Sequence, residues 1–325
     1  MPKDSCKGSR DAGAWTTPLG YNPVVTREEA DKLLISGRYG DLLKEAGSER
    51  TRAEMEGRRL DILQWTLYVV HACRLIGRTN EALQHAYLLL QEVQKLGDAV
   101  LLAEAHLAQA VAFKAARDYD EAIRQLKSSL DVLPDGAPDL LRADILLETA
   151  ETTMEAGLKA EAEAALAKGG ALVHWLRVPR LLARSLFLRS QWEDTSPADL
   201  QLSAAYEIAK SVDYPELQWQ ILWKLSDRAA QQGRDKMAED CLWNAFQILT
   251  RLADPLEPTD ATAFWRQGSR RLFMESAKRK FGGSFFERVM QEGVRKPDNS
   301  TRIIKDLGFD SASIPDFGRR KPPQE

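Results

Sequence analysis

The sequence predicts an all-α fold, a right-handed solenoid of stacked helical hairpins. Short polar breaks recur at a constant interval along the chain. Apolar residues on either side of each break recur at steps of three to five residues, which is typical of amphipathic helices. No stretch of the chain alternates strictly between apolar and polar residues, as a half-buried strand would.

The breaks share one pattern, a short polar turn followed by a helix with an early alanine. Ala82, Ala122 and Ala162 hold the same place in three successive breaks and stand 40 residues apart. Glycine at most breaks suits the left-handed conformation that ends a helix, and the small alanine lets two helices approach closely. Residues 37–42 and 233–238 repeat the pattern. One hairpin cannot bury its apolar faces alone, so neighbouring hairpins are expected to stack.

Four segments follow one another along the chain. Residues 1–24 are rich in Gly, Ser, Thr and Pro, lack the apolar stretch of a secretory signal, and are expected to form a flexible lead-in. Residues 25–252 are expected to form the solenoid, with five to six hairpins. Capping helices are expected over residues 253–296, where Gly282 stops one helix. Residues 297–325 contain few apolar side chains and are expected to form a loose tail.

Individual elements of the solenoid can be placed in order. Thr26 is a cap for the first helix, and the charged, uninterrupted sequence near Arg52 allows the second hairpin to begin there. The Gly169-Gly170 pair predicts a bend or a shortened helix. Residues 178–212 are expected to form a degenerate hairpin, after which one further clear hairpin completes the array.

Residues 103–134, AEAHLAQAVAFKAARDYDEAIRQLKSSLDVLP, resemble the tetratricopeptide repeat family. They keep the family's residues in both helices and at the turn, namely Ala110, Phe113, Asp118, Tyr119, Ala122, Leu126 and Pro134. His106 stands where the family has tryptophan, and the interval of 40 exceeds the usual 34. The longer period resembles that of helical sensor regions in large bacterial regulators. The resemblance covers residues 26–250 and implies a fold more than a function.

Composition narrows the function classes. The chain has 325 residues and a net charge of −3, which gives no reason to expect nucleic acid or an anionic membrane as a partner of the whole chain. Its longest apolar runs fall far short of the about 20 residues that span a bilayer. Three scattered cysteines make a poor disulfide framework and favour a cytoplasmic location.

Catalytic and metal-binding motifs are missing from the sequence. No nucleotide-binding glycine loop, zinc-protease helix or serine-hydrolase elbow occurs. His71 and Cys73 are two residues apart on a helix and do not face each other. We therefore predict no enzymatic activity, no metal and no cofactor.

A basic segment near the C-terminus supports one minor alternative. Its cations are interleaved with aromatic residues, a pattern that could bind anions or nucleic acid. We favour a terminal helix with core aromatics and a solvated basic face. The cations are Arg266, Arg270, Arg271, Lys278, Arg279 and Lys280.

The tetratricopeptide resemblance implies a binding groove lined by the first helix of each hairpin. Counting turns back from each break gives Gln64, His71, Arg74, Glu104, Lys114, Asp144, Glu151, Arg184, Gln220, Trp223 and Asp227. Trp223 is either an aromatic anchor for a partner or a residue buried between helices. The groove lacks the lysine and asparagine set with which family members hold a C-terminal carboxylate.

The sequence thus favours a non-enzymatic scaffold or adaptor that binds a protein or peptide partner in this groove. A regulatory protein that senses a peptide or small molecule and acts on another chain is the main alternative. Nucleic-acid binding through the basic segment has less support, and an enzyme built on a helical toroid has none. Membrane insertion is not expected, and self-association remains open.

Overall fold

The computed structural model describes residues 25–191 and 196–295, which form fourteen α-helices and no strand. In chain order the helices are α1 (Arg27–Ile35), α2 (Tyr39–Met55), α3 (Arg59–Ile76), α4 (Thr79–Gln94), α5 (Ala99–Ala115), α6 (Tyr119–Val132), α7 (Asp139–Glu155), α8 (Lys159–Leu176), α9 (Pro179–Ser190), α10 (Ser196–Ser211), α11 (Pro215–Gln231), α12 (Asp235–Ala253), α13 (Pro258–Arg266) and α14 (Gly268–Arg295). The predicted all-α class is confirmed. The expectations for residues 1–24 and 297–325 concern parts of the chain outside the described residues.

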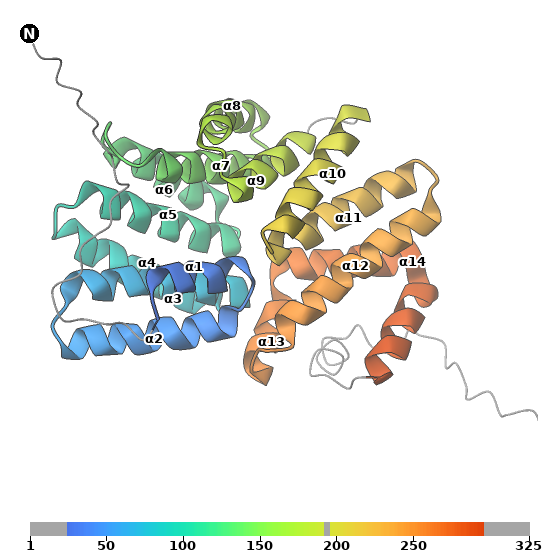
Figure 1. The fold of residues 1–325 in the computed structure, drawn as a ribbon, viewed down its shortest axis with the longest axis horizontal. Coiled ribbons are helices and arrows are strands. Elements are labelled where there is room, and N and C mark those ends of the chain that lie inside the picture. Colours follow the sequence, from blue (N-terminus) through green and yellow to red (C-terminus); the bar gives the residue numbers. More distant parts are fainter. Residues whose placement is uncertain (1–24, 192–195, 296–325) are drawn as a thin grey trace, which may run out of the picture.

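The helices stack as consecutive hairpins (Figure 1). The first helices of successive hairpins, α3, α5, α7 and α9, contact one another in a row. The second helices α4, α6, α8 and α10 each pack against two of the first helices that flank them in sequence. This two-row stacking is the architecture of an α-solenoid. None of the described helices combines the length and the apolarity needed to cross a bilayer.

The early alanines lie where two helices of a hairpin come closest. Ala82, Ala122 and Ala162 stand near the starts of α4, α6 and α8, and each has no exposed surface. A larger side chain there would push the two helices apart, because protein interiors are close-packed. The 40-residue spacing therefore reflects one repeated packing requirement.

Left-handed turns separate the two helices of most hairpins. Gly77 ends α3 with φ of 99°, and Arg117 adopts the same kind of conformation after α5 with φ of 63°. A further turn of this type at Gly57, with φ of 68°, separates α2 from α3. The expectation that a helix begins near Arg52 is therefore wrong: α2 continues through this residue, and α3 begins at Arg59.

Helix α8 runs without interruption through Gly169 and Gly170. The predicted bend is wrong because these glycines serve packing between helices. A Cβ atom on Gly169 would lie 3.1 Å from the Leu146 Cβ atom, and one on Gly170 would lie 2.5 Å from Arg189 Nη2. At Gly169 the free energy that glycine costs inside a helix is offset by the close approach of α8 to α7. At Gly170 the space is taken by the end of the Arg189 side chain from α9.

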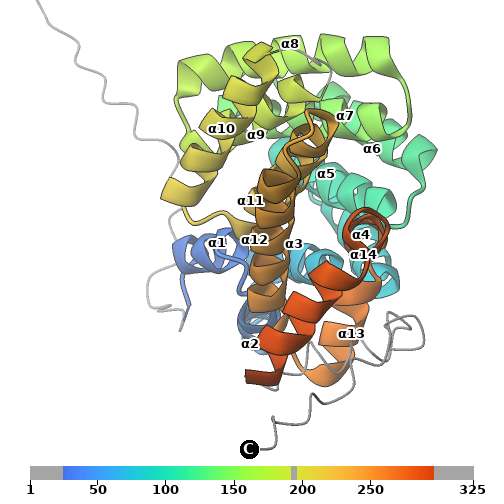
Figure 2. The same cartoon turned by 90° about the vertical axis from the view of Figure 1, so that its right-hand side faces the viewer.

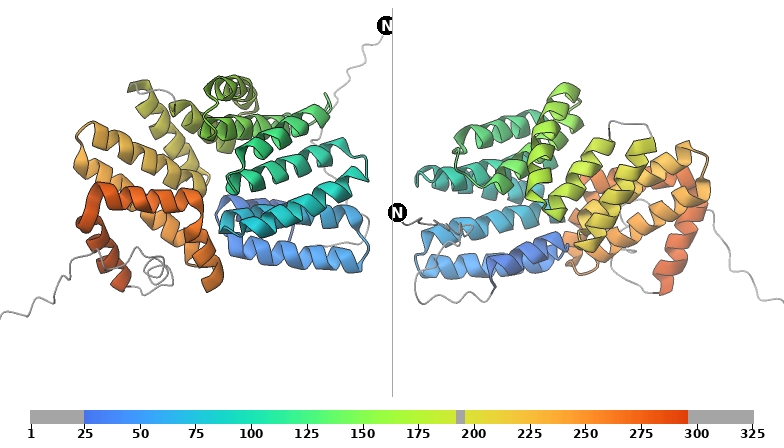
Figure 3. Two further views of the ribbon diagram at one scale, coloured as in Figure 1. Left: turned by 180° about the vertical axis from the view of Figure 1, so that it is seen from behind. Right: turned by 45° about the horizontal axis from the view of Figure 1, so that its top comes forward.

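The array curves until its last helices lie beside its first (Figure 3). The Tyr39 hydroxyl in α2 donates to Glu216 Oε2 in α11 at 2.9 Å, and Arg78 Nε in the turn before α4 donates to Asp260 Oδ1 in α13 at 2.6 Å. We call the contact between these two ends of the array the seam. A large apolar cluster crosses it, with Ile76 on one side and aromatic residues of α11 to α14 on the other. The described helices therefore close into a ring.

Helices α13 and α14 form the segment that the sequence assigns to a cap. They lie across the seam, against α3, α11 and α12 (Figure 2). The backbone leaves the helical conformation at Gly282, with φ of 50° and ψ of −132°, where the sequence predicts a helix stop. This segment contacts both ends of the array, whereas the sequence predicts only that it covers the C-terminal end.

Candidate functional site

The first helices direct polar side chains of four successive hairpins toward one another. We call this surface the inner face. It consists of Gln64, His71 and Arg74 on α3, Glu104 and Lys114 on α5, Asp144, Glu148 and Glu151 on α7, and Arg180 and Arg184 on α9. Eight of these ten were predicted from the resemblance. Residues several turns apart share the face because a helix repeats every 3.6 residues.

An ion network joins three of these helices. Lys114 pairs with Glu148 and, at 3.5 Å, with Glu151, while Arg184 pairs with Glu148 and, through its Nε at 3.2 Å, with Glu151. Two cations thus meet two carboxylates, and the four side chains are 9% to 18% exposed. Burial would raise the pKa of Glu148, but Lys114 and Arg184 outweigh burial and hold that pKa below its usual range.

A second ion pair extends the inner face toward the start of the first helices. Arg180 Nη2 contacts Asp144 Oδ2 at 3.0 Å. Arg180 and Glu148 were not predicted from the sequence. Glu148 lies one turn from both Asp144 and Glu151, so the carboxylate spacing on α7 is a signal that could have identified it.

Helix α3 contributes three polar side chains that each have one atom without a hydrogen bond. Gln64 Oε1, His71 Nδ1 and Arg74 Nε are each shielded from solvent, and no described residue forms a hydrogen bond with them. Burial, followed by the charge of Arg74, lowers the pKa of His71 to about 3, so its imidazole is neutral at pH 7. These groups follow one face of α3 over about three turns.

Carboxyl groups predominate where α1 approaches α5. Burial, followed by the charge of Asp98, raises the pKa of Glu104 to about 7. Asp31 accepts a hydrogen bond from the Tyr68 hydroxyl at 2.9 Å, and burial raises the pKa of Asp31 as well. Glu104 is therefore partly protonated at neutral pH.

The predicted groove residues of α11 lie apart from the ion network. Trp223 is half-buried against Phe273 of α14, and Asp227 pairs with Lys280 of the same helix. Gln220 is also half-buried. Helix α14 therefore covers the part of α11 that the sequence assigns to a partner.

The basic segment does not form one continuous surface. Arg266 ends α13 and is exposed, whereas Arg270 belongs to α14 and has no exposed surface, so the two do not share a helix face. Arg271 contacts Glu275 at 3.4 Å. Of the remaining cations, Lys280 pairs with Asp227, and Lys278 and Arg279 are exposed. Arg270 is thus part of the core and cannot contribute to a surface patch.

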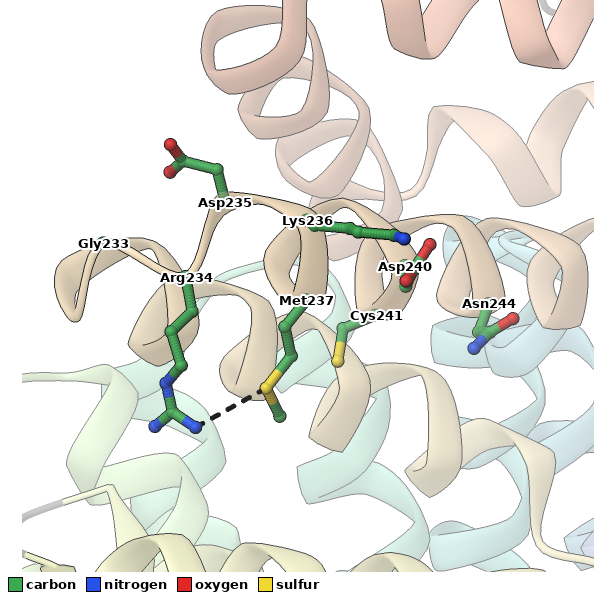
Figure 4. Close-up of a pocket in the computed structure, with 8 residues that line it drawn as sticks. All are labelled: Gly233, Arg234, Asp235, Lys236, Met237, Asp240, Cys241 and Asn244. Carbon is green, nitrogen blue, oxygen red and sulfur yellow. Dashed lines mark hydrogen bonds between the residues drawn. The ribbon is translucent and has the colours of Figure 1, made fainter.

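Two shallow hollows lie elsewhere on the described surface. One, of about 590 Å³, follows the start of α12, where the side chains of Arg234, Met237 and Cys241 point to the same side (Figure 4). The other, of about 480 Å³, lies between α4 and α5 and is lined largely by apolar atoms. Among the described residues, no group of three or more His, Cys, Asp or Glu side chains is placed to hold a metal ion.

Comparisons with known proteins bear on the fold. No family model matches the chain, and no curated protein matches it. The crystal structure of Rap protein complexed with Competence and Sporulation Factor is similar, with a TM-score of 0.59 and 13% identity over 70% of this chain and 64% of that chain. A signal transduction ATPase with numerous domains and a tetratricopeptide repeat sensor, from Pyrococcus horikoshii, gives a TM-score of 0.45 and 12% identity over 84% of this chain and 50% of that chain.

The chain spans less than two thirds of the length of the Rap protein. At this identity the likeness concerns the arrangement of helices and not the chemistry of the site. The described residues therefore have an all-α helical-repeat fold, as the sequence predicts.

Proposed function

We propose that this chain is a non-enzymatic scaffold or adaptor that binds a protein or peptide partner along the inner face. The polar row on α3, formed by Gln64, His71 and Arg74, carries the proposal, because each of these side chains is half-buried and keeps part of its surface open to a partner. An extended peptide supplies backbone donors and acceptors at regular intervals, and polar side chains along one helix face can form hydrogen bonds with them. The ion network beside this row would form a rigid side of the binding surface, because its cations and carboxylates already pair with one another.

The likeness to Rap adds limited support, because that protein was solved in complex with a factor. A cytoplasmic location is part of the same proposal. The proposal gives the class of partner, a protein or peptide, and not its identity or pathway.

A selection experiment tests the proposal. Peptides that bind the immobilised chain would be selected by phage display. Their affinities would then be measured for the wild type, for Arg74→Glu and for Arg124→Glu, which makes the same change on the exposed face of α6. We expect Arg74→Glu to weaken binding about tenfold or more, which is about 1.4 kcal/mol, and Arg124→Glu to have little effect. Equal affinities for the two variants would contradict binding at the inner face.

A second candidate function is a sensor that acts on another chain. It rests on the last turn of α3, where the Arg74 side chain belongs to the inner face while the backbone oxygen of the same residue accepts from Gln267 Nε2 at 3.3 Å. A ligand that moves this turn would also move the start of α14. The sensor function requires a specific ligand to shift both the melting temperature and the hydrogen exchange of α14; a ligand that changes only the inner face would exclude it.

A further inference from the structure

Helix α14 lies along α11 in the same chain direction. Three residues of α14 at helical spacing meet three residues of α11 at helical spacing, in the pairs Phe273 with Trp219, Ser276 with Trp223, and Lys280 with Asp227. The ring centroid of Phe273 is 6.0 Å from that of Trp219 and 5.6 Å from that of Trp223. Trp223 Nε1 donates to Ser276 Oγ at 3.4 Å. We call the three α11 residues the α11 stripe.

We call residues 258–281 the latch. The latch also contacts α3, near the opposite end of the array. Arg270 Nη1 donates to the Leu75 backbone oxygen of α3 at 2.7 Å, and Arg270 Nη2 pairs with Glu216 Oε2 of α11 at 2.9 Å. The guanidinium carbon lies 3.5 Å from the ring centroid of Phe264. One side chain therefore ties α3, α11, α13 and α14 together.

Several polar atoms lack hydrogen bonds where the latch packs against α11. Four shielded atoms of the latch and the α11 stripe have no hydrogen-bond partner among the described residues, namely Trp219 Nε1, Trp265 Nε1, Gln267 Oε1 and Arg270 Nε. Each of these atoms loses water on docking without gaining a protein partner, which opposes the docked state. The apolar contacts of Phe273, Met274 and Ala277, all nearly or fully buried, favour that state. The balance leaves a smaller net preference for docking than the apolar area alone would give.

The backbone is not helical at the start of the latch or at one point within it. Glu257, just before α13, is extended, with φ of −59° and ψ of 152°, so the latch is joined to α12 without a continuous helical backbone. Gln267 between α13 and α14 is extended, with φ of −58° and ψ of 138°, so the two helices join without a continuous helical backbone. The backbone of α14 approaches that of α12 and α13 over a much shorter length than the paired helices of the array approach each other. Segments with few close contacts open at lower free energy than the core of a domain.

We infer that the latch is an intramolecular ligand of the α11 stripe, and that it detaches while the helices from α3 to α9 stay folded. The partner that fits the uncovered stripe is an amphipathic helix. It would place an aromatic residue against Trp219 and Trp223 and, two turns later, a cation against Asp227. A partner of this kind competes with α14. This inference concerns α11 and holds whether or not the inner face of α3 to α9 binds a partner.

Lys280→Glu in the full chain tests the inference, because it places two carboxylates opposite each other at Asp227. Arg279→Glu is the matched control: it makes the same charge change on the adjacent, exposed residue. The double variant Asp227→Lys with Lys280→Glu restores an ion pair of reversed direction. Native-state hydrogen exchange with mass spectrometry would follow peptides of the latch and of α5 to α9 in each variant.

We expect latch amides of the wild type to exchange faster than amides of α5 to α9. Lys280→Glu should raise latch exchange several-fold, Arg279→Glu should leave it unchanged, and the double variant should return it toward the wild-type rate. Latch and array amides that exchange together in every variant would show that the latch opens only on global unfolding, which would overturn the inference.

A second measurement tests the α11 stripe as a helix site. A fluorescently labelled synthetic peptide of residues 268–281 would be titrated into the wild type and into Lys280→Glu. The tethered latch should outcompete the peptide in the wild type, because a linked segment has a high effective concentration, whereas Lys280→Glu should bind the peptide measurably. If Lys280→Glu shows faster latch exchange yet no peptide binding, the stripe is not a helix site and this part of the inference fails.

Discussion

The guanidinium of Arg270 donates to the backbone oxygen of Leu75 across 195 residues of sequence, at 2.7 Å and with no exposed surface. This hydrogen bond joins α14 to α3 at the seam where the described helices close into a ring. A ring restricts how far the first helices can move apart, so the geometry of the inner face depends on contacts at the seam. The inner face and the latch are therefore linked through the last turn of α3, where Gln267 and Arg270 donate to the backbone oxygens of Arg74 and Leu75.

Replacing Arg270 should destabilise the chain strongly. Arg270→Met would leave Glu216 and the Leu75 oxygen without their cation, which costs the docked state about 3–5 kcal/mol. The free energy of unfolding should fall by this amount or by the docking free energy of the latch, whichever is smaller. Arg271→Met, which removes the neighbouring exposed cation, should change the free energy of unfolding by about 0.5 kcal/mol or less. Urea denaturation measures both, and similar values for the two variants would contradict the role of Arg270 at the seam.

The ion network should show coupling between its members. Glu148→Gln leaves Lys114 and Arg184 with one carboxylate, and we expect a loss of about 3–5 kcal/mol. Removing Lys114 and Glu148 together leaves Arg184 and Glu151 as a balanced pair, so the double variant should cost at least about 1 kcal/mol less than the sum of the single variants. A double-mutant cycle by denaturation measures this difference, and strict additivity would show that the network does not act as a unit.

Glu104 should make stability depend on pH near neutrality. Its pKa is about 7 in the folded chain against an ordinary value of 4.5, so the folded state holds this proton more tightly between these two values. Stability from this group is full below pH 4.5 and is lost as the pH rises toward and through 7. Relative to Glu104→Gln, the wild type should therefore lose about 1–3 kcal/mol between pH 5 and pH 8.

Denaturation of both proteins across that range measures the effect of Glu104, and carbon NMR of the Glu104 carboxyl gives its pKa directly. Stability curves that run parallel for wild type and Glu104→Gln would show that this carboxyl titrates normally. The comparison isolates one group, since every other titrating side chain is common to both proteins.

Gly77 and Gly157 hold equivalent turns 80 residues apart but have different neighbours. Both have a positive φ, so alanine at either position should cost about 1 kcal/mol through backbone strain. A Cβ atom at Gly77 would lie 2.4 Å from the Ala263 backbone oxygen, whereas nothing lies within 4 Å at Gly157. We expect Gly77→Ala to be the more destabilising variant by about 1–3 kcal/mol. Equal melting temperatures would mean that the seam at Gly77 is looser than described.

The local sequence pattern was sufficient to predict the repeat, because the residues that specify each hairpin lie close together in sequence. Ala82 and the glycine five residues before it satisfy requirements of one hairpin, and those requirements recur in each hairpin. The same local reasoning failed at Gly169 and Gly170, where Leu146 and Arg189 lie close to α8. These contacts come from neighbouring helices, so a rule for isolated helices could not reveal them.

The inner face was partly predictable for a related reason. Lys114, Glu151 and Arg184 were placed by counting turns, and the structure brings them together. Their mutual ion pairs, and the participation of Glu148, depend on the distances between hairpins. Trp223 satisfied the same count, yet α14 covers it, because nothing in the sequence of α11 specifies what packs upon it.

The sequence by itself determined the all-α class and the hairpin repeat, and it identified most of the polar residues that α3, α5, α7 and α9 place on the inner face, since these follow from helical periodicity and short-range turn chemistry. Only the tertiary structure decided that the array closes, that Arg270 is a core residue and that α14 occupies the α11 stripe. Closure depends on the small rotation between hairpins accumulated over the whole array, which no local pattern encodes. The basic segment illustrates the difference: its composition indicates a charged surface, while the ring buries its central arginine.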